Sequence, residues 1–223
     1  TEGTDFASVS DITISAGSLT GTSSFTPTDD AIYENNETAI ITIDSVSGGS
    51  ATESGSQSTT ITITENESPP TLSINDVTTA DESAGNASLT VTLSNAASSD
   101  VTVQYSTSSS DAVAGSDYTS ASGTLTISAG NTTASLNVAI LGDNIYEGDE
   151  SITVSLSGAI LGSNGLTITD PYGVITITDD DAAPVVSLSS SASSVAENGS
   201  ALTLTATMTT ATTADVTIAL SAS

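Results

Sequence analysis

Two acidic loops contain the residues of this chain that could do chemistry. The segment DDAIYENNE spans residues 29–37, and its near twin GDNIYEGDE spans residues 142–150. Two acidic tripeptides, ENE at 65–67 and DDD at 179–181, follow the loops at corresponding distances. Grouped carboxylates can bind hard cations, and a pair of them can hydrolyse glycosides. We therefore expect the function to depend on carboxylate chemistry.

The composition excludes most other chemistries. The 223 residues include 27 Asp and Glu but no Lys, Arg, His or Cys, so the formal net charge is −27. Without His or Cys the chain cannot form a Ser-His-Asp or Cys-His nucleophile, and zinc and haem lose their usual ligands. Without Lys or Arg, binding of phosphate or nucleic acid is not expected. The sequence contains no run of about 18 apolar residues, so it predicts no membrane-spanning helix in this segment.

The same charge balance requires a cation from solution. Two carboxylates about 4 Å apart repel by roughly 4 kcal/mol at an effective dielectric near 20. The chain has no positive side chain to offset this repulsion. A set of ligands made only of oxygen atoms favours a hard cation such as Ca²⁺ over a transition metal.

An internal repeat of about 113 residues organises the chain. Besides the acidic segments, the corresponding stretches are 12–25 with 125–138, 58–70 with 172–184, 70–85 with 184–199, and 89–108 with 202–223. We therefore predict a complete unit at 70–181, the C-terminal part of a unit at 1–67 and the N-terminal part of a third at 184–223. The chain is then either a window on a long tandem array or a set of half-units that neighbouring copies complete.

The complete unit is predicted to be all-β, because apolar and polar residues alternate along its segments. About seven such segments per unit are typical of an antiparallel sandwich. The residues expected to face the core are Leu89, Val91, Leu93, Val101, Val103, Leu125, Ile127, Leu136, Val138, Ile140, Ile152, Val154, Leu156, Ile175 and Ile177. Prolines at 69–70 and 184 mark the junctions between units. We expect Tyr33 and Tyr146 to pack beneath their own loops.

The ordered set of motifs resembles a Calx-beta repeat, the domain of sodium/calcium exchanger regulatory regions and of many large bacterial surface proteins. The motifs are Glu82, AGSDY at 114–118, GTLTI at 123–127, DNIYEGDE at 143–150 and ITITDDD at 175–181. The resemblance extends over the whole chain, with one complete copy and two partial ones. It implies tandem immunoglobulin-like, seven-stranded antiparallel sandwiches that bind Ca²⁺ at one end, where the acidic loops and tripeptides converge.

The resemblance also implies a set of ligands for each unit. In the complete unit these are Glu82, Asp117, Asp143, Glu147, Asp179, Asp180 and Asp181, with the Ile145 carbonyl. In the first unit they are Asp5, Asp29, Asp30, Glu34, Glu65 and Glu67, with the Ile32 carbonyl. Glu37 and Glu150 are further candidates, and Glu197 is the corresponding opening acid of the third unit. Gly142 stands in the place of Asp29, and Asn66 in the middle of the tripeptide, so we expect one to three ions per site.

Three functions remain open after these exclusions. The first is a structural segment of a secreted or surface-attached repeat protein, such as an adhesin stalk or biofilm fibre, stiffened by Ca²⁺. Its partners would be neighbouring repeats or copies, arranged head-to-tail, and a surface or polysaccharide ligand. The second is a calcium-sensing regulatory module, and the third a carbohydrate-binding accessory module of a secreted hydrolase. Catalysis by Glu82 with Asp117 is not expected, because no aromatic platform for a sugar is evident, so we do not expect an enzyme.

Overall fold

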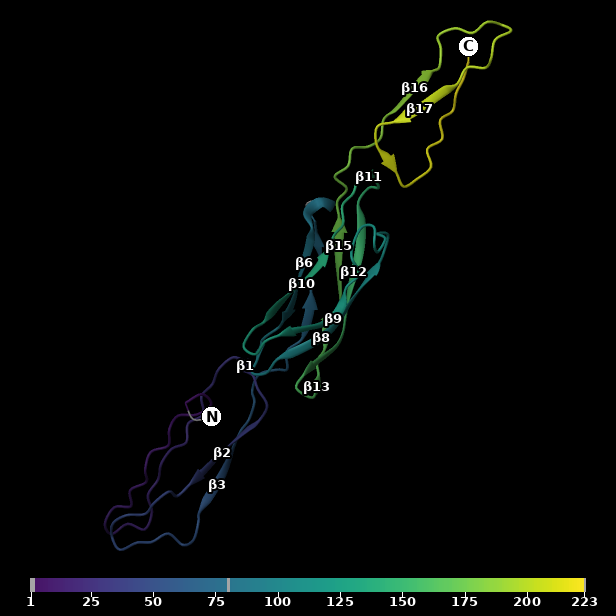
Figure 1. Cartoon of the computed structure of the whole chain (residues 1–223). Coiled ribbons are helices and arrows are strands. Elements are labelled where there is room, and N and C mark those ends of the chain that lie inside the picture. The colour runs from purple at the N-terminus through teal and green to yellow at the C-terminus, as the bar shows by residue number, and fades with distance from the viewer. Residues whose placement is uncertain (1–2, 80, 223) are drawn as a thin grey trace.

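A computed structural model describes residues 3–79 and 81–222. Three parts follow one another along an elongated molecule, with β2 and β3 at one end, a β-sandwich in the middle, and β16 and β17 at the other end (Figure 1). The one helical turn in the described residues is the 3-10 turn η1 (Glu82–Ala84). None of the described residues forms a helix long and apolar enough to cross a membrane. The predicted all-β fold class is confirmed.

The middle sandwich consists of two sheets. The first has the order β10 (Thr133–Ala139), β6 (Asn86–Leu93), β4 (Leu72–Ile74), β14 (Ile168–Asp170). The second has the order β5 (Val77–Thr78), β15 (Tyr172–Ile177), β12 (Glu150–Leu161), β8 (Val101–Ser109), β9 (Ser122–Ile127), and β13 (Asn164–Gly165) also pairs with β12. Pairings β4–β14 and β5–β15 are parallel, and the other pairings of these sheets are antiparallel.

The core lies between these two sheets. Every predicted inward residue is buried except Leu125, which is half-buried and packs against the core from β9. The buried side chains are mostly Val, Leu and Ile, each worth about 1.5–3 kcal/mol on burial. Tyr118 is the one fully buried aromatic residue of the described chain, and its hydroxyl lies 3.1 Å from Ser109 Oγ. Alternation along the strands therefore positions the acidic loops, which lie between strands of a rigid sandwich.

Within residues 3–79 and 81–222, the first and third parts each form a small sheet without a covering layer. The first contains β2 (Glu37–Thr42) paired with β3 (Ser58–Ile63), and the third contains β16 (Val186–Ser190) paired with β17 (Leu204–Met208). Ile14 is 57% exposed, whereas Ile127, at the same repeat position, is 1% exposed. Leu188 is 56% exposed, whereas its counterpart Ile74 is 3% exposed. The apolar faces of both end parts are therefore uncovered.

Two short parallel pairings join the three parts. Strand β1 (Ile32–Tyr33) pairs with β7 (Ala96–Ala97), and β11 (Ile145–Tyr146) pairs with β18 (Ala211–Thr212). Each pairing connects an acidic loop of one part to a strand of the next part. The same element of each repeat therefore makes the contact at both junctions.

Candidate metal centre

Acidic side chains converge in three places. In each of them, carboxylate oxygens of three residues lie within 4.8 Å of one another. The first-unit loop cluster consists of Asp5, Glu34 and Glu37, and the middle-unit loop cluster consists of Asp117, Glu147 and Glu150. The tip cluster consists of Glu82, Asp143 and Asp181. The two loop clusters occupy the same positions of consecutive repeats, so one arrangement is built twice from different residues of the chain.

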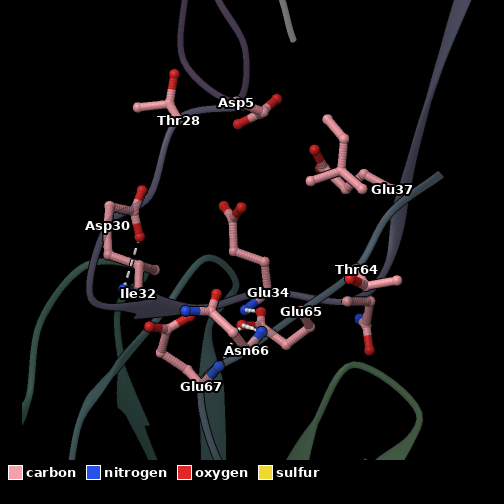
Figure 2. A pocket seen from close by; sticks show the side chains of 12 residues that line it. Asp5, Thr28, Asp30, Ile32, Glu34, Glu37, Thr64, Glu65, Asn66 and Glu67 are labelled. Carbon is pink, nitrogen blue, oxygen red and sulfur yellow. Dashed lines mark hydrogen bonds between the residues drawn. The ribbon is translucent and has the colours of Figure 1, made fainter. Parts of the chain in front are cut away.

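Each loop cluster combines a turn, an acidic loop and the first residue of a strand. Asp5 and Asp117 are buried, and the Asp117 carboxylate accepts a hydrogen bond from the backbone N–H of Val113. Glu37 and Glu150 open strands β2 and β12. Glu34 points from the loop into the space between Asp5, Asp30 and Glu37 (Figure 2). The turn and the strand therefore fix two sides of each cluster, and the loop supplies the third.

The loops are shaped by their own aspartates. Asp30 Oδ1 accepts a hydrogen bond of 2.8 Å from the Ile32 N–H, and Asp143 Oδ1 accepts one of 2.7 Å from the Ile145 N–H. Bonds of this kind, from an aspartate to the backbone two residues on, stabilise tight turns. Because the same turn forms in both repeats, Glu34 and Glu147 leave their loops in equivalent positions.

The first acid of each tripeptide holds the loop through its backbone. Asp179 Oδ2 accepts hydrogen bonds from the Glu147 and Gly148 N–H groups, at 2.9 and 2.6 Å. Glu65 accepts the corresponding hydrogen bond from the Glu34 N–H. Burial alone would raise the pKa of Asp179, but the backbone donors outweigh it, so the pKa is lowered. Asp179 and Glu65 therefore position the loops, and neither belongs to a three-carboxylate cluster.

Two carboxylate oxygens of the tip cluster are buried without a hydrogen-bond partner among the described residues. Glu82 is 6% exposed, and within the described residues its Oε1 has no hydrogen-bond partner. Asp181 Oδ2, in the same cluster, is buried and equally without a partner there. Burying a carboxylate oxygen without a hydrogen bond or a counterion is costly. A cation between Glu82, Asp143 and Asp181 would satisfy both oxygens.

Three threonine and serine contacts bring Glu82 to the tip. Thr178 Oγ1 donates to the Thr79 carbonyl at 3.1 Å, and the Thr178 N–H donates to Thr79 Oγ1 at 3.3 Å. Ser83 Oγ donates to Asp180 Oδ2 at 3.1 Å. These contacts fasten the turn that contains Glu82 to the acidic tripeptide. Thr79, Ser83 and Thr178 could not be identified from the sequence, because single hydroxyl residues in so Ser- and Thr-rich a chain give no distinct signal.

The carboxylates also raise one another's pKa. Burial, followed by the charges of the tripeptide and Asp143, raises the pKa of Glu82 to about 7. Burial, followed by the hydrogen bond and charge of Asp117, raises the pKa of Glu150 to about 7. Burial and neighbouring carboxylates also raise the pKa values of Glu34, Glu147 and Asp181. In each case neighbouring negative charge adds to the effect of burial on the pKa, and a divalent cation would offset that charge.

The donor set fits Ca²⁺ chemically. Ca²⁺ binds six to eight oxygen ligands at about 2.3–2.6 Å and tolerates irregular geometry. Three carboxylates whose oxygens lie within 4.8 Å of one another can share one such ion. The chain has no imidazole or thiolate that would favour zinc or another transition metal.

The other nine predicted ligands lie outside the three clusters. Asp29 Oδ1 accepts a hydrogen bond of 3.0 Å from Asn66 Nδ2, and Glu67 interacts with Glu65, which raises the pKa of Glu67. Ile32 and Ile145 lie in β1 and β11. The predicted ligands outside the three clusters are Asp29, Asp30, Ile32, Glu65, Glu67, Ile145, Asp179, Asp180 and Glu197. Glu197 is exposed.

The two departures from strict repetition are related in space. In the first unit, Asp29 pairs with Asn66, whereas the middle unit has Gly142 and Asp180 at these positions. A Cβ atom on Gly142 would lie 3.1 Å from the Glu82 carbonyl oxygen. Gly142 therefore allows the Glu82 turn to approach the loop closely, and Asp180 bonds to that turn through Ser83.

Comparisons with known proteins found one matching family model and several similar solved structures. The sequence model of the Calx-beta domain family matches residues 1–67 and 65–181. No curated protein matches the chain. Similar solved structures include the apo-form Calx CBD1 domain, at 22% identity and a TM-score of 0.44 over 50% of this chain and 98% of that one. The Calx CBD2 domain is 19% identical, with a TM-score of 0.45 over 49% of this chain and 86% of that one.

A longer relative is similar in only part of its length. The calcium binding domain CBD12 of CALX1.1 is 22% identical to this chain, with a TM-score of 0.46. The match covers 53% of this chain and 49% of that structure.

Proposed function

Because this chain belongs to the Calx-beta family, we propose that it is a calcium-stiffened structural segment of a secreted or surface-attached repeat protein. The observation that supports this proposal is the recurrence of one acidic cluster in consecutive repeats, beside the junctions between them. Asp5, Glu34 and Glu37 repeat as Asp117, Glu147 and Glu150. Repetition of a site along an array is what a structural role requires.

Ca²⁺ is the ion of this family, and one similar structure is described as a calcium binding domain. In this chain the nine carboxylates of the three clusters would hold the ions. The bound ion would supply positive charge, and no reaction is involved. Glu82 and Asp117, the conceivable hydrolase pair, belong to different clusters, which supports a binding role over catalysis.

Stiffening follows from the placement of the clusters. Without a cation, mutual repulsion pushes Glu34 and Glu147 away from the residues that open β2 and β12. A cation would draw each loop toward the strand beside it, β2 or β12, and the loop also contains β1 or β11, which contacts the next part. Ion binding therefore fixes the segment that links consecutive units.

The acidity suits an exterior that contains salt and millimolar calcium. Extracellular calcium modules have dissociation constants of about 10⁻⁴–10⁻³ M. Salt at about 0.15 M screens exposed charges beyond roughly 8 Å, which limits self-repulsion of a chain with net charge −27. We propose an extracellular location on these grounds, with adhesion or matrix formation as the role.

The end parts support assembly with further units. Their apolar faces, which include Ile14 and Leu188, have buried counterparts in the middle sandwich. An opposing half-sandwich, from an adjoining repeat or a neighbouring copy, would cover these faces in a head-to-tail arrangement. Denaturing electrophoresis of the native assembly distinguishes these sources, because separate copies run at the chain mass of 21.9 kDa and a covalent array runs far above it.

A calcium-sensing module is the alternative, because a site beside a junction between units is also what a two-domain sensor needs. A carbohydrate-binding module has less support, since the chain has no Trp. A sensor would change the angle between units when calcium binds, whereas a structural segment would keep the angle and lose flexibility. Small-angle scattering in calcium and in EGTA measures that difference.

The direct test is a calcium titration of the whole chain by calorimetry, with thermal melting in calcium and in EGTA. We expect saturable binding and a lower melting temperature in EGTA. The variant Asp143→Asn/Asp181→Asn should lose part of the binding, and Asp44→Asn, an exposed acid outside the clusters, should bind as the wild type does. Absence of binding at millimolar calcium, or an unchanged melt, contradicts the proposal.

A further inference from the structure

The contact between consecutive units is the same at both junctions. At the first, Ile32 and Tyr33 pair in parallel with Ala96 and Ala97 of the middle unit. At the second, Ile145 and Tyr146 pair in the same direction with Ala211 and Thr212 of the third part. We call Ile32–Tyr33 and Ile145–Tyr146 the docking strands. The same pairing with the same register occurs at two junctions, which indicates a specific contact between units.

Hydrogen bonds on both sides of the pairing hold it in place. The Ser98 N–H donates to the Tyr33 carbonyl at 3.0 Å, which extends the pairing beyond β7. Within the middle unit, the Gly130 N–H donates to the Ala97 carbonyl at 2.8 Å. Strand β7 therefore bonds to its own sandwich on one side and to the preceding unit on the other.

The linkers make a matching pair of contacts. Asn95 Nδ2 donates to the Ser68 carbonyl at 3.1 Å across the first junction. Thr210 Oγ1 donates to the Ala182 carbonyl at 2.8 Å across the second. In both cases a side chain just before the receiving strand holds the linker residue that follows an acidic tripeptide. The linker and the docking strand thus meet the same edge of the next unit.

Tyr33 adds a side-chain contact to these backbone bonds. Tyr33 packs against the hydrophobic core of the middle unit, although it belongs to the loop of the preceding one. Tyr33, Glu34 and Asn35 line a hollow whose other wall consists of Ser98, Ser99 and the turn at 161–164. The expectation that Tyr33 packs beneath its own loop is therefore wrong, because the next unit provides the apolar surface.

The second junction repeats the backbone pairing of the first. Tyr146 is 37% exposed, and its strand β11 pairs with β18 in the same direction and register as β1 pairs with β7.

We propose that the Ile-Tyr docking strand and the edge formed by β7, Ser98, Ser99 and the turn at 161–164 are a donor and an acceptor surface that hold successive units at a fixed angle. The partner of the acceptor surface is the Ile-Tyr-Glu loop of another unit of the same kind. The pairing itself consists of backbone hydrogen bonds and the packing of an aromatic ring. It therefore acts with or without a bound cation, in addition to the calcium sites.

The experiment measures the distance between units in the whole chain. The chain contains no cysteine, so Thr60→Cys in β3 and Thr126→Cys in β9 place two unique spin labels on exposed positions of adjacent parts. Pulsed electron resonance then gives the distance distribution in EGTA and in calcium. Tyr33→Ala tests the docking strand, Tyr33→Phe retains the ring, and Tyr172→Ala removes an exposed tyrosine of β15 away from the junction.

We expect Tyr33→Ala to broaden the distance distribution relative to that of the wild type in both solutions. Tyr33→Phe and Tyr172→Ala should keep the wild-type width in each solution. Thermal melting checks that the middle sandwich stays folded in every variant. A Tyr33→Ala distribution as narrow as that of the wild type would overturn the proposal, whether or not the chain binds calcium.

Discussion

The carboxylate of Asp179 accepts a hydrogen bond of 2.9 Å from the backbone N–H of Glu147. The two residues come from the acidic tripeptide and the acidic loop, and Glu65 bonds to Glu34 in the same way one repeat earlier. A tripeptide that follows the last strand of a unit thus determines where the loop ends. The position of Glu147 in its cluster depends on a residue outside that cluster.

Removing this support should weaken calcium binding without removing a cluster member. Asp179→Ala deletes an acceptor of hydrogen bonds from Glu147, Gly148 and Asp181. Because bonds to a charged group are worth about 1.5–3 kcal/mol each, we expect at least a tenfold loss of affinity and a lower melting temperature in EGTA. Calorimetry and thermal melting measure these effects. As a control, Asp76→Ala loses a hydrogen bond from the Val174 N–H, which belongs to none of the clusters. This variant should lower stability without changing calcium affinity. Equal affinity in Asp179→Ala and wild type contradicts the positioning role.

Neutralising Glu82 should have opposite effects with and without calcium. Glu82→Gln removes one of three mutually repelling charges, and its amide can donate to the buried Asp181 Oδ2, so the calcium-free protein should become more stable. The same change removes a ligand, so calcium should stabilise the variant less than the wild type. In EGTA the variant should therefore melt at a higher temperature than the wild type, and in millimolar calcium this order should be reversed. If the variant melts lower than the wild type in EGTA, Glu82 is not under repulsive strain.

Stability of the calcium-free protein should fall between pH 4.5 and about 7. Glu82 and Glu150 have folded pKa values of about 7 against ordinary values of 4.5, because burial and neighbouring carboxylates favour their protonated forms. A raised carboxyl pKa means that the folded state binds the proton more tightly than the unfolded state does. This contribution to stability is therefore fully present below pH 4.5 and is lost as pH rises through about 7. The lowered pKa of Asp179 acts in the opposite direction only below its ordinary value of 3.8.

Calcium should reverse this dependence. Binding requires ionised carboxylates, so calcium affinity should rise from pH 5 to about 8 as Glu82 and Glu150 lose their protons. Urea denaturation in EGTA and in calcium, across that pH range, measures both slopes. A calcium-free protein whose stability increases from pH 5 to 7 would show that the clusters do not raise these pKa values.

A side chain at position 142 should displace the Glu82 turn. A Cβ atom there would contact the Glu82 backbone at 3.1–3.2 Å, which is tighter than ordinary packing. We therefore expect Gly142→Ala and Gly142→Asp both to weaken binding at the tip cluster, even though Asp adds a carboxylate. The matched exchange Asp29→Gly should have little effect on the middle unit. An increase in affinity in Gly142→Asp would mean that the missing charge, not the space, limits this site.

Alternation of apolar residues was sufficient to predict the sandwich and almost all of its core. The alternation depends only on which side of a strand a residue faces, and the pairing preserves it from Leu89 to Ile177. Leu125 is the exception because β9 is the last strand of its sheet, where one side of the strand has no neighbour. The repeat itself also indicated that Asp5 and Asp117 would have equivalent positions.

Which acids position the loops and which form the clusters could not be predicted in this way. Asp179 and Asp181 look identical in the sequence, yet one bonds to backbone groups and the other belongs to the tip cluster. This difference depends on the direction in which each carboxylate leaves the chain after β15. The role of Tyr33 was mistaken for a similar reason, since sequence alone does not reveal which unit provides the apolar surface around a loop residue.

The docking strand is two residues long, whereas β12 pairs with β8 over most of its length. Tension along the long axis should therefore separate β1 from β7 well before the middle sandwich loses a strand. A tether with such joints would lengthen in small, reversible steps and absorb a pull while each domain stays folded. Force spectroscopy that shows only large unfolding steps, with no shorter extensions before them, would rule out this elasticity.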